Sequence, residues 1–126
     1  MEIKTGLYYT KEHEWVRVEK DTAYIGITDF AQAHMGDIVF VELPETGSEY
    51  SAMETVGVIE SVKAASDMHI PIAGSIIKVN EALETNPELL NAEPYINWIF
   101  SVEIGDPADL DNLMDAAAYE AFCAVE

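Results

Sequence analysis

The sequence predicts a mainly β domain, closed as a flattened barrel or sandwich, with short helices and a helical C-terminus. Three observations support this fold class. Apolar and polar residues alternate with a period of two through the first two thirds of the chain, as in half-buried strands. Turn residues such as glycine and proline interrupt these runs at short intervals. Apolar residues make up 49% of the 126 residues, enough for the core of one domain over residues 1–126.

The first elements are a hairpin, a short helix and a strand. Two β-rich runs at 15–18 and 23–28 flank polar residues and predict the hairpin. Thr28 or Asp29 can then cap a helix through "FAQAHM", and Gly36 suits its left-handed end. The segment "DIVFVELP" returns to a strand, which ends at Pro44.

The central stretch predicts three strands. They cover residues 55–61, 66–72 and 75–79, with a tight connection at 62–65. Gly57 would weaken the first of these strands unless a bulge or a close backbone approach requires a residue without a side chain. Two successive hairpins imply a small, curled sheet.

Helices and one strand are expected in the last third. Asn86 can cap and Pro87 can start a short helix through residue 90, and residues 98–104 are β-like. Asp106 followed by Pro107 repeats the cap-then-proline pattern, and Asp115 can cap a final helix. Three apolar residues fall near helical spacing and predict the buried face of that helix: Ala118, Phe122 and Val125.

The charge is strongly acidic. The 24 Asp and Glu residues against 6 Lys and Arg residues give a formal net charge of -18. Such a surface repels phosphate backbones and anionic membranes, which argues against nucleic-acid and membrane partners and favours partners with basic rims. The charge can also serve mainly to keep the protein soluble and monomeric.

The single cysteine and the three histidines indicate neither a disulfide nor a metal site. Cys123 has no partner thiol and no basic neighbour to activate it, so we expect a small buried apolar residue in a reducing compartment. The histidines lack metal-ligand spacing. The N-terminus has no signal or transit pattern, and no apolar run is long enough to span a membrane, so the expected location is cytoplasmic.

Lys63 is the most informative residue. From residue 21 onward the only cationic side chains are Lys63 and Lys78, and Lys63 lies in the turn "VKAA" between acidic residues. A lysine can keep a turn soluble, but such turns are seldom built from valine and alanine. A Schiff-base amine needs burial or a cationic neighbour, whereas these acidic neighbours favour the charged ammonium. An exposed lysine that another enzyme modifies fits better.

The chain resembles the glycine cleavage system H protein, a family of lipoyl carriers. Six segments occur in the order and spacing of that family over residues 6–120: "YTKEHEWV", "IGITDFAQ", "GDIVFVELPETG", "ESVKAASD", "PIAG" and "VNEAL". The resemblance implies the barrel-sandwich hybrid fold shared by lipoyl and biotinyl carriers. It also implies lipoate in amide linkage on Lys63, added by a lipoate ligase or lipoyl transferase.

The resemblance further implies a non-catalytic carrier of an aminomethyl group and of reducing equivalents. The expected partners are a pyridoxal phosphate glycine decarboxylase, a tetrahydrofolate aminomethyltransferase and a flavin-dependent dihydrolipoamide dehydrogenase. In the family, the loaded arm is thought to fold into a surface cleft, and the matching positions here are Glu14, His34 and Asp67. From the residues alone, Glu14 could be a solvated charge, His34 a capping or core histidine, and Asp67 the residue that holds the turn.

The sequence departs from the family pattern at several places. The segment "PYINW" is one residue shorter than the usual form and lacks its glycine, so the wall it might supply to the cleft is in doubt. Glu12 stands where some relatives have a smaller polar residue. Two alternative functions stay open, a lipoate donor to other enzymes and an unmodified interaction domain. Biotin carriage fits less well, because Val62 and Ala64 replace the methionines typical of a biotinyl turn.

Overall fold

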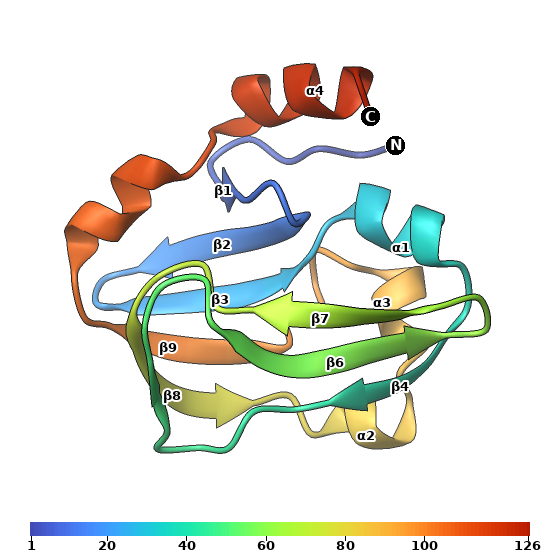
Figure 1. Ribbon diagram of the computed structural model, residues 1–126, viewed down its shortest axis with the longest axis horizontal. Coiled ribbons are helices and arrows are strands. Elements are labelled where there is room, and N and C mark those ends of the chain that lie inside the picture. Colours follow the sequence, from blue (N-terminus) through green and yellow to red (C-terminus); the bar gives the residue numbers. More distant parts are fainter.

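The computed structural model describes residues 1–126 and contains two antiparallel sheets (Figure 1). The six strands of the larger sheet are, in spatial order, β1 (Tyr8–Tyr9), β2 (Glu14–Glu19), β3 (Thr22–Ile27), β9 (Phe100–Ile104), β8 (Gly74–Val79) and β5 (Glu49–Tyr50). The three strands of the smaller sheet are β4 (Ile38–Glu42), β6 (Thr55–Ser61) and β7 (Ala65–His69). The prediction of a mainly β fold is confirmed, and the two sheets stay separate rather than forming one closed barrel.

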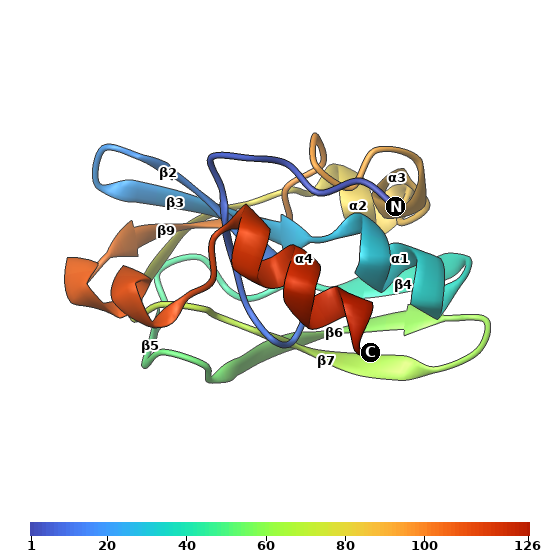
Figure 2. The same ribbon diagram turned by 90° about the horizontal axis from the view of Figure 1, so that it is seen from above.

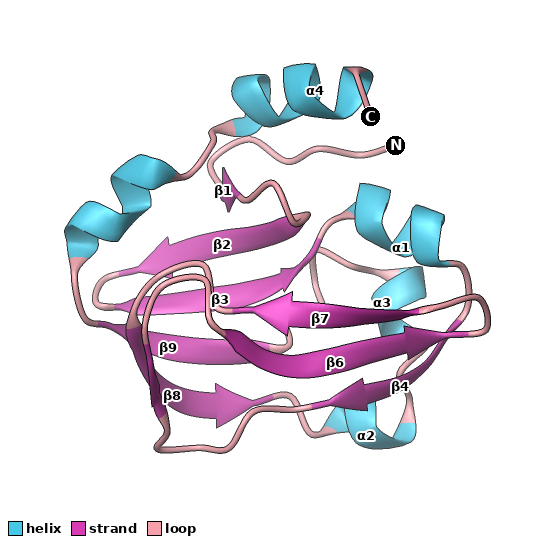
Figure 3. Ribbon diagram, in the orientation of Figure 1, coloured by secondary structure: helices cyan, strands magenta, loops and turns pink.

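Short helices and one longer helix complete the fold (Figure 3). Thr28 caps the first helix, since its hydroxyl accepts a hydrogen bond from the Ala31 amide, and Gly36 ends it with a φ of 77°. These two end residues agree with the sequence prediction. The helices are α1 (Asp29–Met35), α2 (Ala82–Thr85), α3 (Leu89–Ala92), the 3₁₀ helix η1 (Pro107–Asn112) and α4 (Ala116–Ala124).

Gly57 occupies a bulge in β6, as predicted. The register between β6 and β7 shifts at this point. A Cβ atom on Gly57 would lie 2.1 Å from the backbone oxygen of Glu42 on β4. The close approach of two backbones therefore requires glycine here.

Several predicted boundaries are wrong. Asn86 does not cap a helix; it ends α2, with its amide bonded to the Ala82 carbonyl, and α3 starts only at Leu89. The strand predicted over 66–72 ends at His69, because the amide of Ile70 bonds to Glu54 in the loop before β6. The strand predicted over 98–104 begins at Phe100. At the end of β7, a contact distant in sequence therefore overrides the local signal.

The buried face of α4 also differs from the prediction. Tyr119 and Cys123 are buried, whereas Ala118 and Val125 are exposed and Phe122 is half-buried. Tyr119 stacks on Tyr9 with ring centroids 4.5 Å apart, so the aromatic rings, rather than the alanines, orient the helix. Figure 2 shows α4 crossing the N-terminal segment. Cys123 is a buried apolar residue, as expected.

The main core lies between the two sheets. It joins residues of the larger sheet, such as Ile25 and Phe100, to residues of the smaller sheet, such as Val41 and Ile59. A second cluster of buried residues lies beneath α4: Tyr9, Trp15, Tyr95, Tyr119 and Cys123. None of the helices has the length and the apolar character that crossing a bilayer requires.

Candidate functional site

The candidate site begins at the turn between β6 and β7, which carries Lys63. The hydroxyl of Ser61 accepts hydrogen bonds from the amides of Lys63 at 3.2 Å and Ala64 at 3.1 Å. The Ser61 amide in turn donates to the Ala64 carbonyl at 2.8 Å. Val62 is tied to the residue before β4, because its amide donates to the Asp37 carbonyl at 3.0 Å. The turn is therefore a fixed platform at the end of a hairpin (Figure 1).

The side chain of Lys63 is exposed, and its amine forms no ion pair. A Cβ atom on Gly36 would lie 3.0 Å from the Lys63 Cε and 3.8 Å from its Nζ. The aliphatic stem therefore lies beside the end of α1. The glycine that ends the helix also leaves room for this stem.

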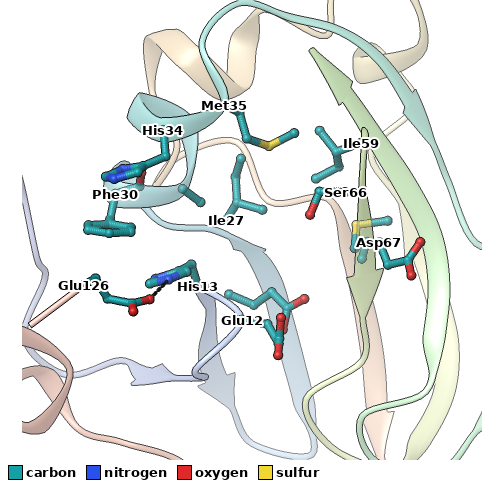
Figure 4. A pocket seen from close by; sticks show the side chains of 13 residues that line it. Glu12, His13, Ile27, Phe30, His34, Met35, Ile59, Ser66, Asp67 and Glu126 are labelled. Atoms are coloured by element: carbon teal, nitrogen blue, oxygen red, sulfur yellow. Dashed lines mark hydrogen bonds and ion pairs between the residues drawn. The ribbon is translucent and has the colours of Figure 1, made fainter. Parts of the chain in front are cut away.

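A cavity of about 380 Å³ lies beside the same hairpin (Figure 4). Met35 from α1, Ile59 from β6 and Ser66 from β7 line it, which places the cavity next to the elements that carry the lysine turn. Its lining contains no Lys or Arg. Four carboxylates belong to the lining: Glu12, Glu14, Asp67 and Glu126. A cavity with apolar walls and several carboxylates suits a long apolar chain that ends in a cation.

Glu14 is the buried carboxyl group of this cavity, with only 2% of its surface exposed. Thr10 Oγ1 donates to Oε1 at 2.9 Å, and the His69 amide donates to Oε2 at 2.9 Å. Burial raises the pKa of Glu14 to about 7, and the hydrogen bonds from His69 and Thr10 oppose part of this rise. The alternative of a solvated surface charge is therefore wrong for Glu14.

His34 lies on the last turn of α1, where it is exposed. Its ring stacks on Phe30 with centroids 4.0 Å apart, and Nδ1 donates to the Phe30 carbonyl at 3.1 Å. The ring of His13 also stacks on Phe30, with ring centroids 4.4 Å apart. His34 is therefore not a core histidine; it belongs to an aromatic wall of the cavity (Figure 4).

Asp67 lies on β7 at the rim of the cavity and is exposed. In Figure 4 its carboxylate points away from the labelled side chains that surround the cavity. The Asp67 carboxylate makes no hydrogen bond within the protein, and the hydroxyl of Ser61 holds the turn instead. The alternative role of Asp67 as the residue that holds the turn is therefore wrong.

The structure brings the three predicted pocket residues to one cavity and adds residues that the sequence did not suggest. Thr10 and His69, which bond to Glu14, and His13 and Phe30, which form the aromatic wall, were all missed. Alternation in a strand gives the face on which a residue lies, but it does not tell which distant side chain meets it. No signal in the sequence pairs residue 69 with residue 14.

The shortened segment "PYINW" does not form a wall of the cavity. None of residues 94–98 lines it. The indole of Trp15 donates to the Pro94 carbonyl at 3.0 Å, and the Tyr95 hydroxyl donates to the Glu2 carbonyl at 2.7 Å. The segment therefore supports the cluster beneath α4, and its departure from the family pattern leaves the cavity intact.

Comparison with known proteins identifies the family. The family model described as "Glycine cleavage H-protein" matches residues 7–126. The chain belongs to the glycine cleavage H-protein family. Among its relatives, the glycine cleavage system H protein of Thermoanaerobacter sp. strain X514 is 54% identical over 122 residues, or 97% of each chain. That of Syntrophomonas wolfei is 54% identical over 126 residues, covering 100% of this chain and 97% of the relative.

A solved H protein also matches the fold. The crystal structure of the glycine cleavage system H protein from Mycobacterium marinum superposes with a TM-score of 0.87 at 33% identity. The match covers 97% of this chain and 99% of that chain. The two-sheet architecture with short helices is therefore the architecture of an H protein.

Proposed function

We propose that this chain is the lipoyl carrier of a glycine cleavage system and that lipoate is attached in amide linkage to Lys63. Membership of the H-protein family supports the carrier role. The observation that carries the attachment site is the exposed, unpaired amine on a hydrogen-bonded turn at the end of a hairpin. A modifying enzyme can reach such an amine without unfolding the protein.

The cavity fits the tethered group and its cargo. Met35, Ile59 and Ser66 line the side nearest the lysine hairpin, and an apolar wall suits the alkyl arm. When bound, lipoate would supply thiol and disulfide exchange chemistry through its dithiolane. Glu14 would pair with the cationic aminomethyl cargo, while His34 and Asp67 would form the mouth of the cavity. Exclusion of water from this cavity would slow loss of the cargo.

The chain itself supplies no catalytic group in this proposal. Its partners are a pyridoxal phosphate glycine decarboxylase, a tetrahydrofolate aminomethyltransferase, a flavin-dependent dihydrolipoamide dehydrogenase, and a lipoate ligase or lipoyl transferase. The net charge of -18 favours partners whose binding surfaces are basic and disfavours self-association, so we propose a monomer. A cytoplasmic location is supported by the single, buried Cys123.

The decisive experiment is to express the protein with a lipoate ligase and free lipoate and to measure its intact mass. We expect one lipoyl increment, and peptide mapping should place it on Lys63. An unmodified chain, when a known carrier is labelled in the same cells, would refute the proposal. Loading by glycine and the reconstituted decarboxylase would then separate glycine cleavage from a role as lipoate donor alone.

A further inference from the structure

The contact between Glu14 and His69 joins the two sheets at the cavity. Glu14 is the first residue of β2 in the larger sheet, and His69 is the last residue of β7 in the smaller sheet. The His69 amide lies 2.9 Å from Oε2 of Glu14, and Nδ1 of the His69 ring lies 3.3 Å from the same oxygen. Since a carboxylate can only accept, the ring donates through Nδ1.

The ring of His69 is the only side chain of the smaller sheet that bonds to Glu14. Thr10 bonds to the other oxygen, Oε1, at 2.9 Å. A carboxyl group that is 2% exposed is costly to ionise, and each donor that it loses favours its protonated form. The backbone amide of residue 69 stays in place whatever its side chain is. The ring donor can therefore be removed without removing the amide donor.

No Lys or Arg lines the cavity, so none stands in for the ring of His69. The Nε2 atom of His13 bonds to Glu126 at 3.0 Å, and the ring of His34 stacks on Phe30, so neither of these histidines serves Glu14. The titratable groups that line the cavity with Glu14 are Glu12, His13, His34, Asp67 and Glu126.

We propose that His69 is a positioning residue of the pocket. Its ring holds Glu14 ionised, and it thereby sets the pH above which the pocket retains a cationic group. The identity of that cation as the aminomethyl cargo rests on the proposed function, whereas the effect of His69 on Glu14 does not. A positioning role predicts that a side chain able to donate from the same place will substitute in part for the ring.

The sign of the effect follows from the carboxyl group. Glu14 attracts a cation only as a carboxylate, so retention is strong above its pKa and is lost as the pH falls through it. With His69 present, the pKa of Glu14 is about 7. Without the ring donor the pKa rises further, and retention would then require a more alkaline solution.

The first test measures Glu14 directly in the unmodified protein. The chemical shift of its carboxyl carbon is followed by NMR against pH in the native chain and in three variants, and the midpoint of each titration gives the pKa of Glu14. We expect His69→Leu to raise the midpoint by about one pH unit or more, because the charge interaction with the ring and the hydrogen bond from it are both lost. His69→Asn should restore part of the native value, because its amide can donate as Nδ1 does but carries no charge. His34→Leu is the matched control, which should leave the midpoint in place.

Two results would overturn the proposal in this test. One is an unchanged or lower midpoint in His69→Leu, in a protein whose NMR spectrum shows the native fold. The other is an equal rise in His34→Leu, which would show that any change in the cavity has the same effect. Neither result depends on lipoylation of the protein.

The second test uses the lipoylated and loaded protein. The lifetime of the loaded form is measured against pH for the native chain, His69→Leu and His69→Asn. The profile of His69→Leu should move to higher pH by the same amount as its NMR midpoint, and that of His69→Asn should lie between the native profile and that of His69→Leu. A moved midpoint with an unmoved lifetime profile would overturn the retention role of His69. Failure of lipoylation would instead refute the carrier function, and the NMR test would still decide the effect on Glu14.

Discussion

The lysine turn and the Glu14 pocket use opposite means of placing one functional group. Lys63 is exposed, and the hydrogen bonds that shape its turn come mainly from residues 61–64. Glu14 is buried, and its partners Thr10 and His69 lie 4 and 55 residues away in sequence. The comparison shows that a group to be reached by other proteins can be built locally. A group that must be shielded from water needs contacts from both sheets.

The largest expected effect is a complete loss of lipoyl incorporation on changing the lysine of the turn. Lys63→Arg keeps the charge but removes the amine that can form an amide, so lipoyl incorporation should fall to zero by intact mass. The free energy of unfolding should change by less than about 0.5 kcal/mol, because the side chain is exposed and unpaired. Lys78→Arg is the matched control and should be modified normally. Lipoylation that persists in Lys63→Arg would place the acceptor elsewhere.

Glu14→Gln, unlike Lys63→Arg, should change the free energy of unfolding, by an amount that depends on pH. The pKa of Glu14 is about 7 in the folded protein against an ordinary value of 4.5, so its ionisation opposes folding. Below pH 4.5 the carboxyl group is neutral in both states, and the cost develops as the pH rises through 7. Relative to the native chain, the variant should therefore gain up to about 3 kcal/mol between pH 4.5 and 8.

Urea unfolding of both proteins across this pH range checks the prediction. The comparison between them removes the effect of the other acidic groups, which repel one another in both chains. A difference that is constant with pH would mean that Glu14 is ionised in the fold at no cost. Burial in the pocket would then cost the Glu14 charge no more free energy than exposure in the turn costs the Lys63 charge.

Ser61→Ala should have an intermediate effect on the turn. Its hydroxyl accepts from the Lys63 and Ala64 amides, so the loss should cost about 1 kcal/mol in urea unfolding. Hydrogen exchange at these two amides should become faster, and lipoylation should slow because the platform is less fixed. Ser51→Ala is the matched control, since Ser51 is exposed and its hydroxyl makes no hydrogen bond. Equal changes in both variants would show that the turn does not depend on Ser61.

The smallest expected effect is that of Asp67→Asn. Its carboxylate is exposed and points away from the cavity, so the lifetime of the loaded form should shorten by no more than about twofold. Glu14→Gln, measured in the same assay, should shorten it far more. A larger effect of Asp67→Asn would mean that the rim contributes as much as the buried carboxyl group.

The sequence predicted what is built from neighbouring residues. The caps of α1 at Thr28 and Gly36, the bulge at Gly57 and the turn at Lys63 all follow from local patterns, and the structure has each of them. The family resemblance also directed attention to Glu14, His34 and Asp67, which do line one cavity. Their roles toward a bound group stay predictions.

Long-range contacts decided what the sequence could not predict. The stacking of Tyr9 on Tyr119 sets the buried face of α4, and it joins residues 110 positions apart, from 9 to 119. The bond of Ile70 to Glu54 shortens β7. The partnership of Glu14 with His69 depends on how two separate sheets approach each other. None of these has a periodic or local signature.

The hydroxyl of Tyr119 on α4 has a consequence for the order of events during synthesis. It bonds to His13 Nδ1 at 2.8 Å and to Thr28 Oγ1 at 2.7 Å, and so ties both the wall of the cavity and the start of α1 to a helix that follows all the strands in the chain. Contacts between such distant residues close the largest loops and form late. On the ribosome, the chain therefore completes the hairpin that presents Lys63 well before it completes the cavity beside it.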